Sequence, residues 1–191
     1  MGSKIQQLFN IVLSSSESSN LINAFAEWDL EDTEEDVDAD SVCICGKENI
    51  RYLHLIRNRI NGNTLFPIGS SCIEKFERSD LNEMISLKES MFRLFHAVEN
   101  NEFLSLSSNL FSRKLIKYLY EQGAFTSTQF EEEDSYEFLL KMFNKKSKRT
   151  ITEKQDKKIK AILLNNIKPY VKAKISKKIK GDIENLGEKD E

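Results

Sequence analysis

Residues 41–72, SVCICGKENIRYLHLIRNRINGNTLFPIGSSC, contain all three cysteines of the 191-residue chain, at positions 43, 45 and 72. One of the only two histidines, His54, lies in the same stretch. Structural zinc sites commonly use three cysteines and one histidine in a tetrahedral arrangement. The clustering therefore predicts one structural zinc ion bound by Cys43, Cys45, His54 and Cys72.

The same stretch has the pattern of a β-hairpin followed by a short helix. Side chains alternate along a strand, so one face would carry Ile50, Tyr52, His54 and Ile56. The pair Asn61-Gly62 is a hairpin signal, because both residues tolerate positive φ. The segment PIGSSC then predicts a turn and a serine cap, with Cys72 in the first helical turn. We expect the hairpin to return His54, and the loop to return Cys72, to the C-x-C-G turn.

Two alternatives to this ligand set stay open at the level of sequence. Three buried free cysteines would need no metal, because free cysteine is among the most buried residue types. His96, in MFRLFHAVE, is a second candidate for the fourth ligand, although a helical surface or core role is the simpler interpretation. With four protein ligands the zinc site would be closed, and a closed site stabilises the fold and does not catalyse.

Helical periodicity dominates outside this stretch. Apolar residues spaced three and four apart predict a long helix from about residue 81 to 98 and shorter helices near residues 5–12, 111–122 and 136–143. A second N-terminal helix would use Leu21, Phe25 and Trp28, and a Thr152–Gln155 capping box opens a last helix that Pro169 should interrupt. The predicted fold is mainly α (α+β), a helical domain with a small zinc-bound β-hairpin element.

The expected organisation follows these patterns. Residues 1–40 would form N-terminal helices and an acidic segment, and residues 41–78 the zinc-binding hairpin. Residues 79–180 would form a helical domain with a basic C-terminal helix, followed by a frayed tail at 181–191. No segment reaches the roughly 18 apolar residues that cross a bilayer, and the odd cysteine number fits a reducing compartment. We therefore expect a cytoplasmic protein.

The formal net charge of −3 conceals a strong polarity along the chain. Residues 1–40 contain 1 basic and 10 acidic residues, whereas residues 141–191 contain 16 basic and 7 acidic ones. Such asymmetry is typical of chains with charged partners, or of two ends that attract each other.

The acidic run at residues 27–40, EWDLEDTEEDVDAD, has nine acids and no base. It would be either a solvated linker or a surface that imitates nucleic-acid phosphates and occupies a basic groove, because such grooves bind DNA largely through charge. The candidate partner-binding residues are Trp28, Asp29, Glu31, Asp32, Glu34, Glu35 and Asp36. Trp28 would be an apolar anchor, although a single tryptophan also suits a core.

The lysine-rich C-terminal region also has two interpretations. Val171, Ile175 and Ile179 recur every four residues among lysines, which is typical of a solvated helix packed on a core. Alternatively, the lysines would bind phosphates without reading bases. No P-loop, dinucleotide-binding, serine-hydrolase or zinc-protease motif is present, so we predict a non-enzymatic protein without catalytic residues. A hydrolase whose site these motifs do not reveal is the weaker alternative.

Two segments carry a resemblance to known proteins. CICGKENIRYLHLIRN with IGSSCIEKF resembles a small zinc element of bacteriophage-encoded proteins, and the helical region from FSRKLIKYLYEQGAF onward is similar to its companion there. The whole resembles zinc-binding type II anti-CRISPR proteins. That resemblance implies a phage protein, active in the bacterial host cytoplasm, that inhibits a CRISPR effector nuclease by binding it and blocking guide RNA or target DNA. The alternative is a zinc-containing, nucleic-acid-binding phage accessory protein.

Overall fold

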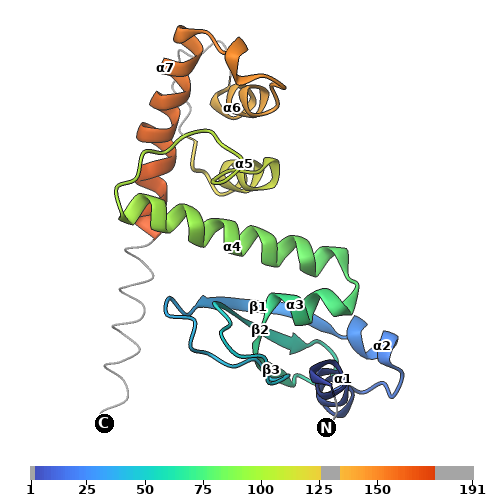
Figure 1. Ribbon diagram of the computed structural model, residues 1–191. Helices are drawn as coiled ribbons and strands as arrows, with labels where there is room; N and C mark the ends of the chain where they lie inside the picture. Colours follow the sequence, from blue (N-terminus) through green and yellow to red (C-terminus); the bar gives the residue numbers. More distant parts are fainter. Residues whose placement is uncertain (1–2, 126–133, 175–191) are drawn as a thin grey trace, which may run out of the picture. The chain divides into compact units, whose positions relative to one another are not determined.

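The computed structural model describes residues 3–125 and 134–174 and has the predicted α+β fold (Figure 1). The chain divides into two compact units, residues 1–89 and 90–191. The first unit contains α1 (Lys4–Ser15), α2 (Leu21–Ala26), β1 (Trp28–Glu35), β2 (Tyr52–Asn58), β3 (Thr64–Ile68), α3 (Ser70–Ile73), the 3₁₀ helix η1 (Glu74–Phe76) and the first half of α4 (Ser79–Glu99). The second contains the rest of α4, α5 (Arg113–Glu121), α6 (Ser135–Phe143), the 3₁₀ helix η2 (Lys148–Thr150), α7 (Glu153–Ile162) and the π-helical turn η3 (Leu163–Ile167).

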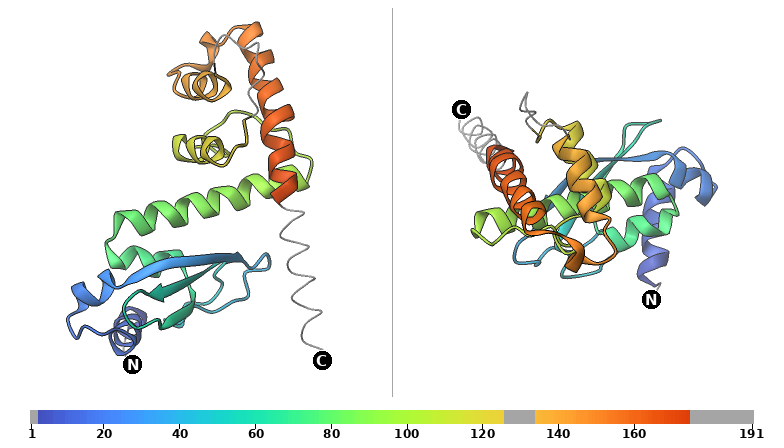
Figure 2. Two further views of the ribbon diagram at one scale, coloured as in Figure 1. Left: turned by 180° about the vertical axis from the view of Figure 1, so that it is seen from behind. Right: turned by 90° about the horizontal axis from the view of Figure 1, so that it is seen from above.

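A three-stranded antiparallel sheet in the order β1-β2-β3 forms the centre of the first unit (Figure 2). The predicted hairpin is confirmed as β2 and β3, in which Ile56 pairs with Leu65. The connection between β2 and β3 spans residues 59–63, so it is longer than a two-residue turn. Asn58, the last residue of β2, closes this loop. The Asn58 side-chain oxygen accepts from the amides of Ile60 and Asn61, at 2.8 and 3.2 Å. Gly62 has a φ of 78° within this loop, a conformation that glycine adopts without strain.

The acidic run forms a strand, which corrects both the expected helix around Trp28 and the expected linker. Helix α2 ends at Ala26, and β1 pairs with β2 along its length, from Trp28 opposite Asn58 to Glu35 opposite Tyr52. Aspartate and glutamate are depleted in strands. However, one side of β1 is buried, which the number of its acidic residues does not reveal. Its buried residues are Trp28, Leu30 and Thr33. Burial of this side against the core overrides the local preference for coil.

Helices α1 and α2 contact each other and complete the core of the first unit. Leu8 and Val12 of α1 are buried, as the predicted helical face requires. The Phe25 ring of α2 stacks on that of Phe76, with ring centroids 4.3 Å apart. The Asn20 side chain caps α2 by accepting from two backbone amides, which matches the predicted capping role of the serine-rich break.

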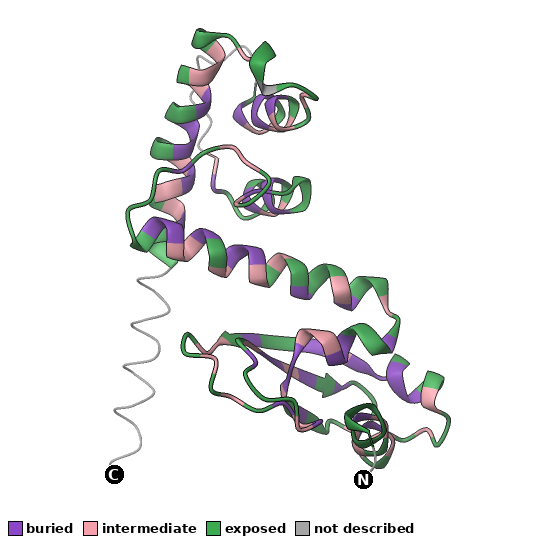
Figure 3. Ribbon diagram, viewed as in Figure 1, coloured by how far each residue is buried: buried purple, intermediate pink, exposed green. Residues whose placement is uncertain are grey.

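The helices of the second unit lie close to the positions that the periodicity predicts. The capping box at Thr152 and Gln155 is confirmed, and on α7 the buried residues lie on the side that faces α5 and α6 (Figure 3). Pro169 does not end the last helix, which continues to residue 174 after the π-helical turn. Proline offers no N–H to the carbonyl four residues earlier, and the wider turn just before it accommodates this loss.

Some predictions lie outside the described residues. These are the frayed tail at 181–191 and the part of the lysine-rich C-terminal region beyond residue 174. In the described part, Val171 is fully buried, and Lys172 and Lys174 are exposed. Among residues 3–125 and 134–174, no helix has the length and apolar character needed to cross a membrane.

Candidate metal centre

Cys43, Cys45 and Cys72 come together as a buried cluster in the first unit. The Cys72 sulfur lies 3.6 Å from that of Cys43 and 3.3 Å from that of Cys45. The exposed fractions of the three residues are 3%, 2% and 7%. Their donor atoms all lie within 4.8 Å of one another, close enough to hold one metal ion. The sequence-based prediction of a metal-binding cysteine cluster is therefore supported for these three residues.

A tight turn presents the first two sulfurs. The Gly46 amide donates to the Cys43 carbonyl at 2.7 Å, and the Cys43 amide donates to the Lys47 carbonyl at 2.8 Å. Gly46 has a φ of 81°, so any other residue would strain this turn. The Ile44 amide donates to the Pro67 carbonyl at 3.0 Å, which attaches the turn to the edge of β3.

Helix α3 supplies the third sulfur. Its N-cap is Gly69 rather than the predicted serine, and the Gly69 amide donates to the Cys43 sulfur at 3.3 Å. A Cβ at Gly69 would lie 3.2 Å from Ile50 Cγ2, so the small residue permits a close approach of the chain. Cys72 lies in the first turn of α3, as expected.

The cluster favours a thiolate at Cys43. Contact with the Cys72 thiol, together with hydrogen bonds from the backbone amides of Cys45 and Gly69, lowers the pKa of Cys43 to about 5. The neighbouring Cys43 sulfur, burial and the Cys45 sulfur raise the pKa of Cys72. With this pKa, Cys43 is deprotonated at neutral pH. It is therefore available as a ligand, because metals bind the thiolate form of cysteine.

His54 is fully buried but does not belong to this cluster. Its Nδ1 atom lies 3.0 Å from Thr33 Oγ1, and its Nε2 atom lies 3.1 Å from Ser70 Oγ. Ser70 Oγ in turn donates to Glu89 Oε1 at 2.6 Å. Because Ser70 uses its only proton for the carboxylate, Nε2–H must donate to Ser70, and the Thr33 hydroxyl donates to Nδ1.

The geometry of α3 explains why His54 and the sulfurs are apart. Ser70 and Cys72 are two positions apart on the helix, and such residues face different sides. Ser70 contacts His54 while Cys72 contacts the other cysteines. Burial lowers the pKa of His54 to about 4, so its ring is neutral at pH 7. Thr33, Ser70 and Glu89 were not predicted as site residues. Thr33 could not be found by alternation from the buried Trp28 and Leu30, because a register shift between Leu30 and Asp32 changes which residues of β1 face inward.

The alternative fourth ligand, His96, belongs to the second unit. Its Nδ1 atom lies 3.7 Å from Glu99 Oε2 on the same helix. It does not join the cysteine group. Among residues 3–125 and 134–174, the three cysteines are the only group of histidine, cysteine, aspartate or glutamate side chains with metal-binding geometry.

The predicted partner-binding residues differ in their environment. Trp28 is fully buried, and its Nε1–H donates to Ser16 Oγ at 2.9 Å. It is therefore a core residue, and the prediction of an exposed anchor is wrong, because β1 turns this side chain inward. Among the carboxylates, Glu31, Asp32 and Glu34 are exposed, whereas the Glu35 side chain is only 6% exposed.

Basic residues of the same unit neutralise most of these carboxylates. Arg57 binds Glu31 with two hydrogen bonds, at 2.9 and 3.0 Å. The remaining ion pairs are Arg51 with Glu35 at 2.8 Å, Arg78 with Asp29 at 3.1 Å and Lys88 with Asp32 at 4.0 Å.

Two of the predicted carboxylates are not in ion pairs of this kind. The Asp36 carboxylate accepts from the Ser41 hydroxyl at 2.6 Å and orders the turn after β1. Among the described residues, Glu34 has no ion-pair partner, and it is exposed.

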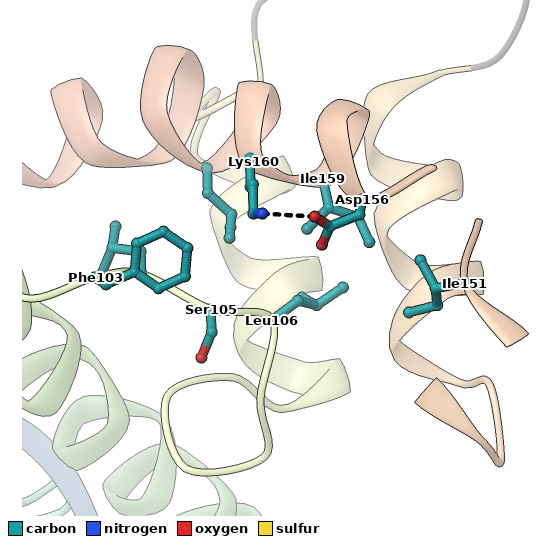
Figure 4. Close-up of a pocket in the computed structure, with 9 residues that line it drawn as sticks. Phe103, Ser105, Leu106, Ile151, Asp156, Ile159 and Lys160 are labelled. Carbon is teal, nitrogen blue, oxygen red and sulfur yellow. Dashed lines mark ion pairs between the residues drawn. The ribbon is translucent and has the colours of Figure 1, made fainter. Parts of the chain in front are cut away.

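A separate cleft of about 270 Å³ lies within the second unit (Figure 4). It is lined by Phe103, Leu104, Ser105, Leu106, Ile151, Asp156, Ile159, Lys160 and Leu163. Asp156 and Lys160 form an ion pair at 2.6 Å on its wall. The Phe103 side chain is 70% exposed. The lining is mostly apolar and carries one neutralised charge pair, which suits an apolar side chain better than an ionic ligand.

Comparison with known proteins adds no relative to this description. No protein-family model matches the chain, and searches of curated proteins and of solved structures give no match.

Proposed function

We propose that Cys43, Cys45 and Cys72 bind one zinc ion with a structural role. With a Zn–S bond of about 2.3 Å, a tetrahedral ion places its sulfur ligands about 3.8 Å apart. The two sulfur–sulfur distances of 3.6 and 3.3 Å are within a few tenths of an ångström of this value. The soft thiolate donors also suit zinc.

The proposed ion would reinforce the connection between the C-x-C-G turn and α3, which hydrogen bonds from Lys47 Nζ to Ser71 Oγ at 3.0 Å and from the Gly69 amide to Cys43 Sγ at 3.3 Å already join. It links the turn at residues 43–46 to α3, across the edge of β3. Structural zinc contributes its binding free energy to folding, so the ion would stabilise the whole first unit. The metal content of protein purified without chelator tests this proposal, with one zinc per chain as the expected result. A folded protein with less than a tenth of an equivalent of any metal would contradict it.

We further propose that the chain inhibits a CRISPR effector nuclease by binding it, without an enzymatic activity of its own. The observation that carries this proposal is the charge of the first unit. Residues 1–89 contain 16 acidic and 8 basic residues, a formal charge of −8. A basic groove that binds guide RNA or target DNA is the kind of surface that such a unit would recognise. The sequence resemblance to anti-CRISPR proteins supplies the class of partner.

The structure suggests which carboxylates would face such a groove. Glu34, Asp38 and Asp40 are exposed and have no ion-pair partner among the described residues. The paired residues of β1 instead hold the strand to β2 and to the segment after η1, so their neutralisation would disturb the sheet. Partner contact therefore rests on Glu34, Asp38 and Asp40, with the paired carboxylates supporting the strand.

Co-migration of the purified chain with the effector nuclease in size-exclusion chromatography tests the proposal. The triple variant Glu34→Gln, Asp38→Asn, Asp40→Asn should weaken the complex at least tenfold. A matched control removes three exposed charges elsewhere in the first unit, as Glu48→Gln, Glu74→Gln, Glu77→Gln. Equal weakening by both triples would show a non-specific charge effect. Absence of a complex between the wild-type chain and the nuclease, with and without guide RNA, would refute the inhibitor proposal.

Nucleic-acid binding by the second unit is the alternative proposal. Residues 90–191 contain 20 basic and 15 acidic residues, a formal charge of +5. Two of the α7 lysines, Lys157 and Lys160, already pair with acidic residues one helical turn away, which reduces the charge available for phosphates. A gel-shift titration at low and high salt tests this alternative, because phosphate-driven binding weakens steeply with salt.

A further inference from the structure

The ligands that the structure brings together differ from those expected for a closed zinc site. A structural zinc site normally has four protein ligands. In residues 3–125 and 134–174, three thiols meet and no fourth histidine, cysteine, aspartate or glutamate side chain joins them. The chain has no cysteine beyond these three. Of the two histidines, His54 is the one that lies in the same unit as the cysteines, and it would join the described cluster as a fourth ligand only by movement of its ring.

Hydrogen bonds from three separate elements oppose such a movement. Thr33 of β1 holds Nδ1, Ser70 of α3 holds Nε2, and Glu89 of α4 holds the Ser70 hydroxyl. His54 is fully buried, and Thr33 is 4% exposed. Rotation of the ring toward the sulfurs would leave the Thr33 hydroxyl buried without its partner, which native structures avoid. The network thus gives both ring nitrogens a role that needs no metal.

We infer that the chain binds its metal through three sulfur atoms alone, and that His54 is a structural residue of the sheet. This inference rests on the proposed metal binding and changes only its ligand set. The class of ligand is a thiophilic ion that tolerates three sulfur ligands, since thiolates select soft metals. When zinc is bound, its fourth position is filled by a donor from outside the histidines and cysteines of the chain.

X-ray absorption spectroscopy of the zinc-loaded, full-length protein tests this ligand set. The expected spectrum has three sulfur neighbours at about 2.3 Å and lacks the outer-shell scattering of an imidazole ring. The variant His54→Gln should keep one zinc per chain, with a zinc Kd within threefold of the wild-type value. His96→Gln is the matched control for loss of a histidine. Cys72→Ala should lower zinc affinity by at least a hundredfold.

Nitrogen NMR of the wild-type histidines provides a measurement that does not depend on the variant folding. The His54 ring should give the signature of an Nε2-protonated tautomer, and its nitrogen resonances should not shift when zinc is added. An imidazole ligand in the absorption spectrum, or a zinc-dependent shift of His54, would overturn the inference and leave the proposed zinc intact. A wild-type chain that retains no zinc would overturn both.

Discussion

Burial of His54 predicts a loss of stability in mild acid. The folded protein holds this ring neutral, with a pKa of about 4, whereas a histidine in the unfolded chain has a pKa of about 6.5. As the pH falls below about 6.5, His54 binds a proton in the unfolded state but stays unprotonated in the folded state. Stability therefore decreases as the pH falls from about 6.5 to 4, and the group contributes its full stability only above this window.

The magnitude follows from the difference between the two pKa values. One pKa unit corresponds to about 1.4 kcal/mol, so the full difference is worth about 3 kcal/mol at pH 4. Between pH 7 and pH 5 the expected loss is about 2 kcal/mol. This is a large fraction of the stability of a small unit, which lies between about 5 and 15 kcal/mol.

Urea unfolding of the wild-type protein and of His54→Gln, each at pH 7, 6 and 5, measures this effect. Other titrating groups contribute equally to both proteins, so the difference between their free energies of unfolding isolates His54. That difference should shrink by about 2 kcal/mol from pH 7 to pH 5. Glu89 lies 3.8 Å from Nε2 and would stabilise a charged ring. A constant difference would show that this carboxylate balances burial, and a difference that grows in acid would show that it outweighs burial; either result would refute the reasoning.

Three further outcomes are expected from the same structure. Cys72→Ala should lower the Tm, and addition of a chelator should lower the Tm of the wild type but not that of the variant, because structural zinc contributes to folding. Glu27→Gln should destabilise the protein at pH 7, and this deficit should shrink in acid. Burial raises the pKa of Glu27, but hydrogen bonds from Asn58 and two backbone amides outweigh burial and lower it, so the folded state favours the carboxylate. Leu139→Ala, at a fully buried position of α6, should cost about 2–5 kcal/mol of the free energy of unfolding, measured by denaturant titration.

Helical periodicity was sufficient to predict most of the second unit. Local signals such as the Thr152–Gln155 capping box depend only on neighbours in the sequence, and they were confirmed. The buried face of each helix was harder to predict than its position in the sequence. On α6, the apolar spacing of Tyr136, Leu139 and Phe143 predicts one buried face, but the structure buries Phe138 and Met142 with Leu139 and leaves Tyr136 and Phe143 half-buried. A helix with apolar residues on most sides does not reveal which side will find a neighbour.

Strand β1 was not predicted by the sequence patterns. Its carboxylates indicate coil, and no local pattern indicates that Arg57 and Arg51 form ion pairs with Glu31 and Glu35. These cross-strand pairs depend on the sheet register, which is a property of residues more than fifteen positions apart. An exposed ion pair such as Arg57–Glu31 contributes little stability, but both pairs remove repulsion that a strand with so many acidic residues would otherwise have.

This missing strand also accounts for the misplaced ligand. A hairpin alone leaves one face of His54 without a neighbour, so a metal was a reasonable partner for its nitrogen. Strand β1 places Thr33 directly opposite His54 in the register and gives Nδ1 a hydrogen bond. The three cysteines, in contrast, needed no knowledge of β1, because glycine turns and the hairpin determine their approach. The thiol part of the site was therefore predictable, and the histidine part was not.

The segment at residues 69–72 connects the cysteine cluster to the histidine network. Gly69 donates its amide to the Cys43 sulfur, Ser70 accepts from His54, and Cys72 supplies the third sulfur. Because residues two apart on a helix face different sides, one short turn contacts both groups without bringing them together. A metal bound to Cys72 would fix the turn that also positions Ser70. The same turn therefore serves both groups, while the hydrogen bonds that join His54 to Thr33 and Ser70 hold the imidazole with or without the ion.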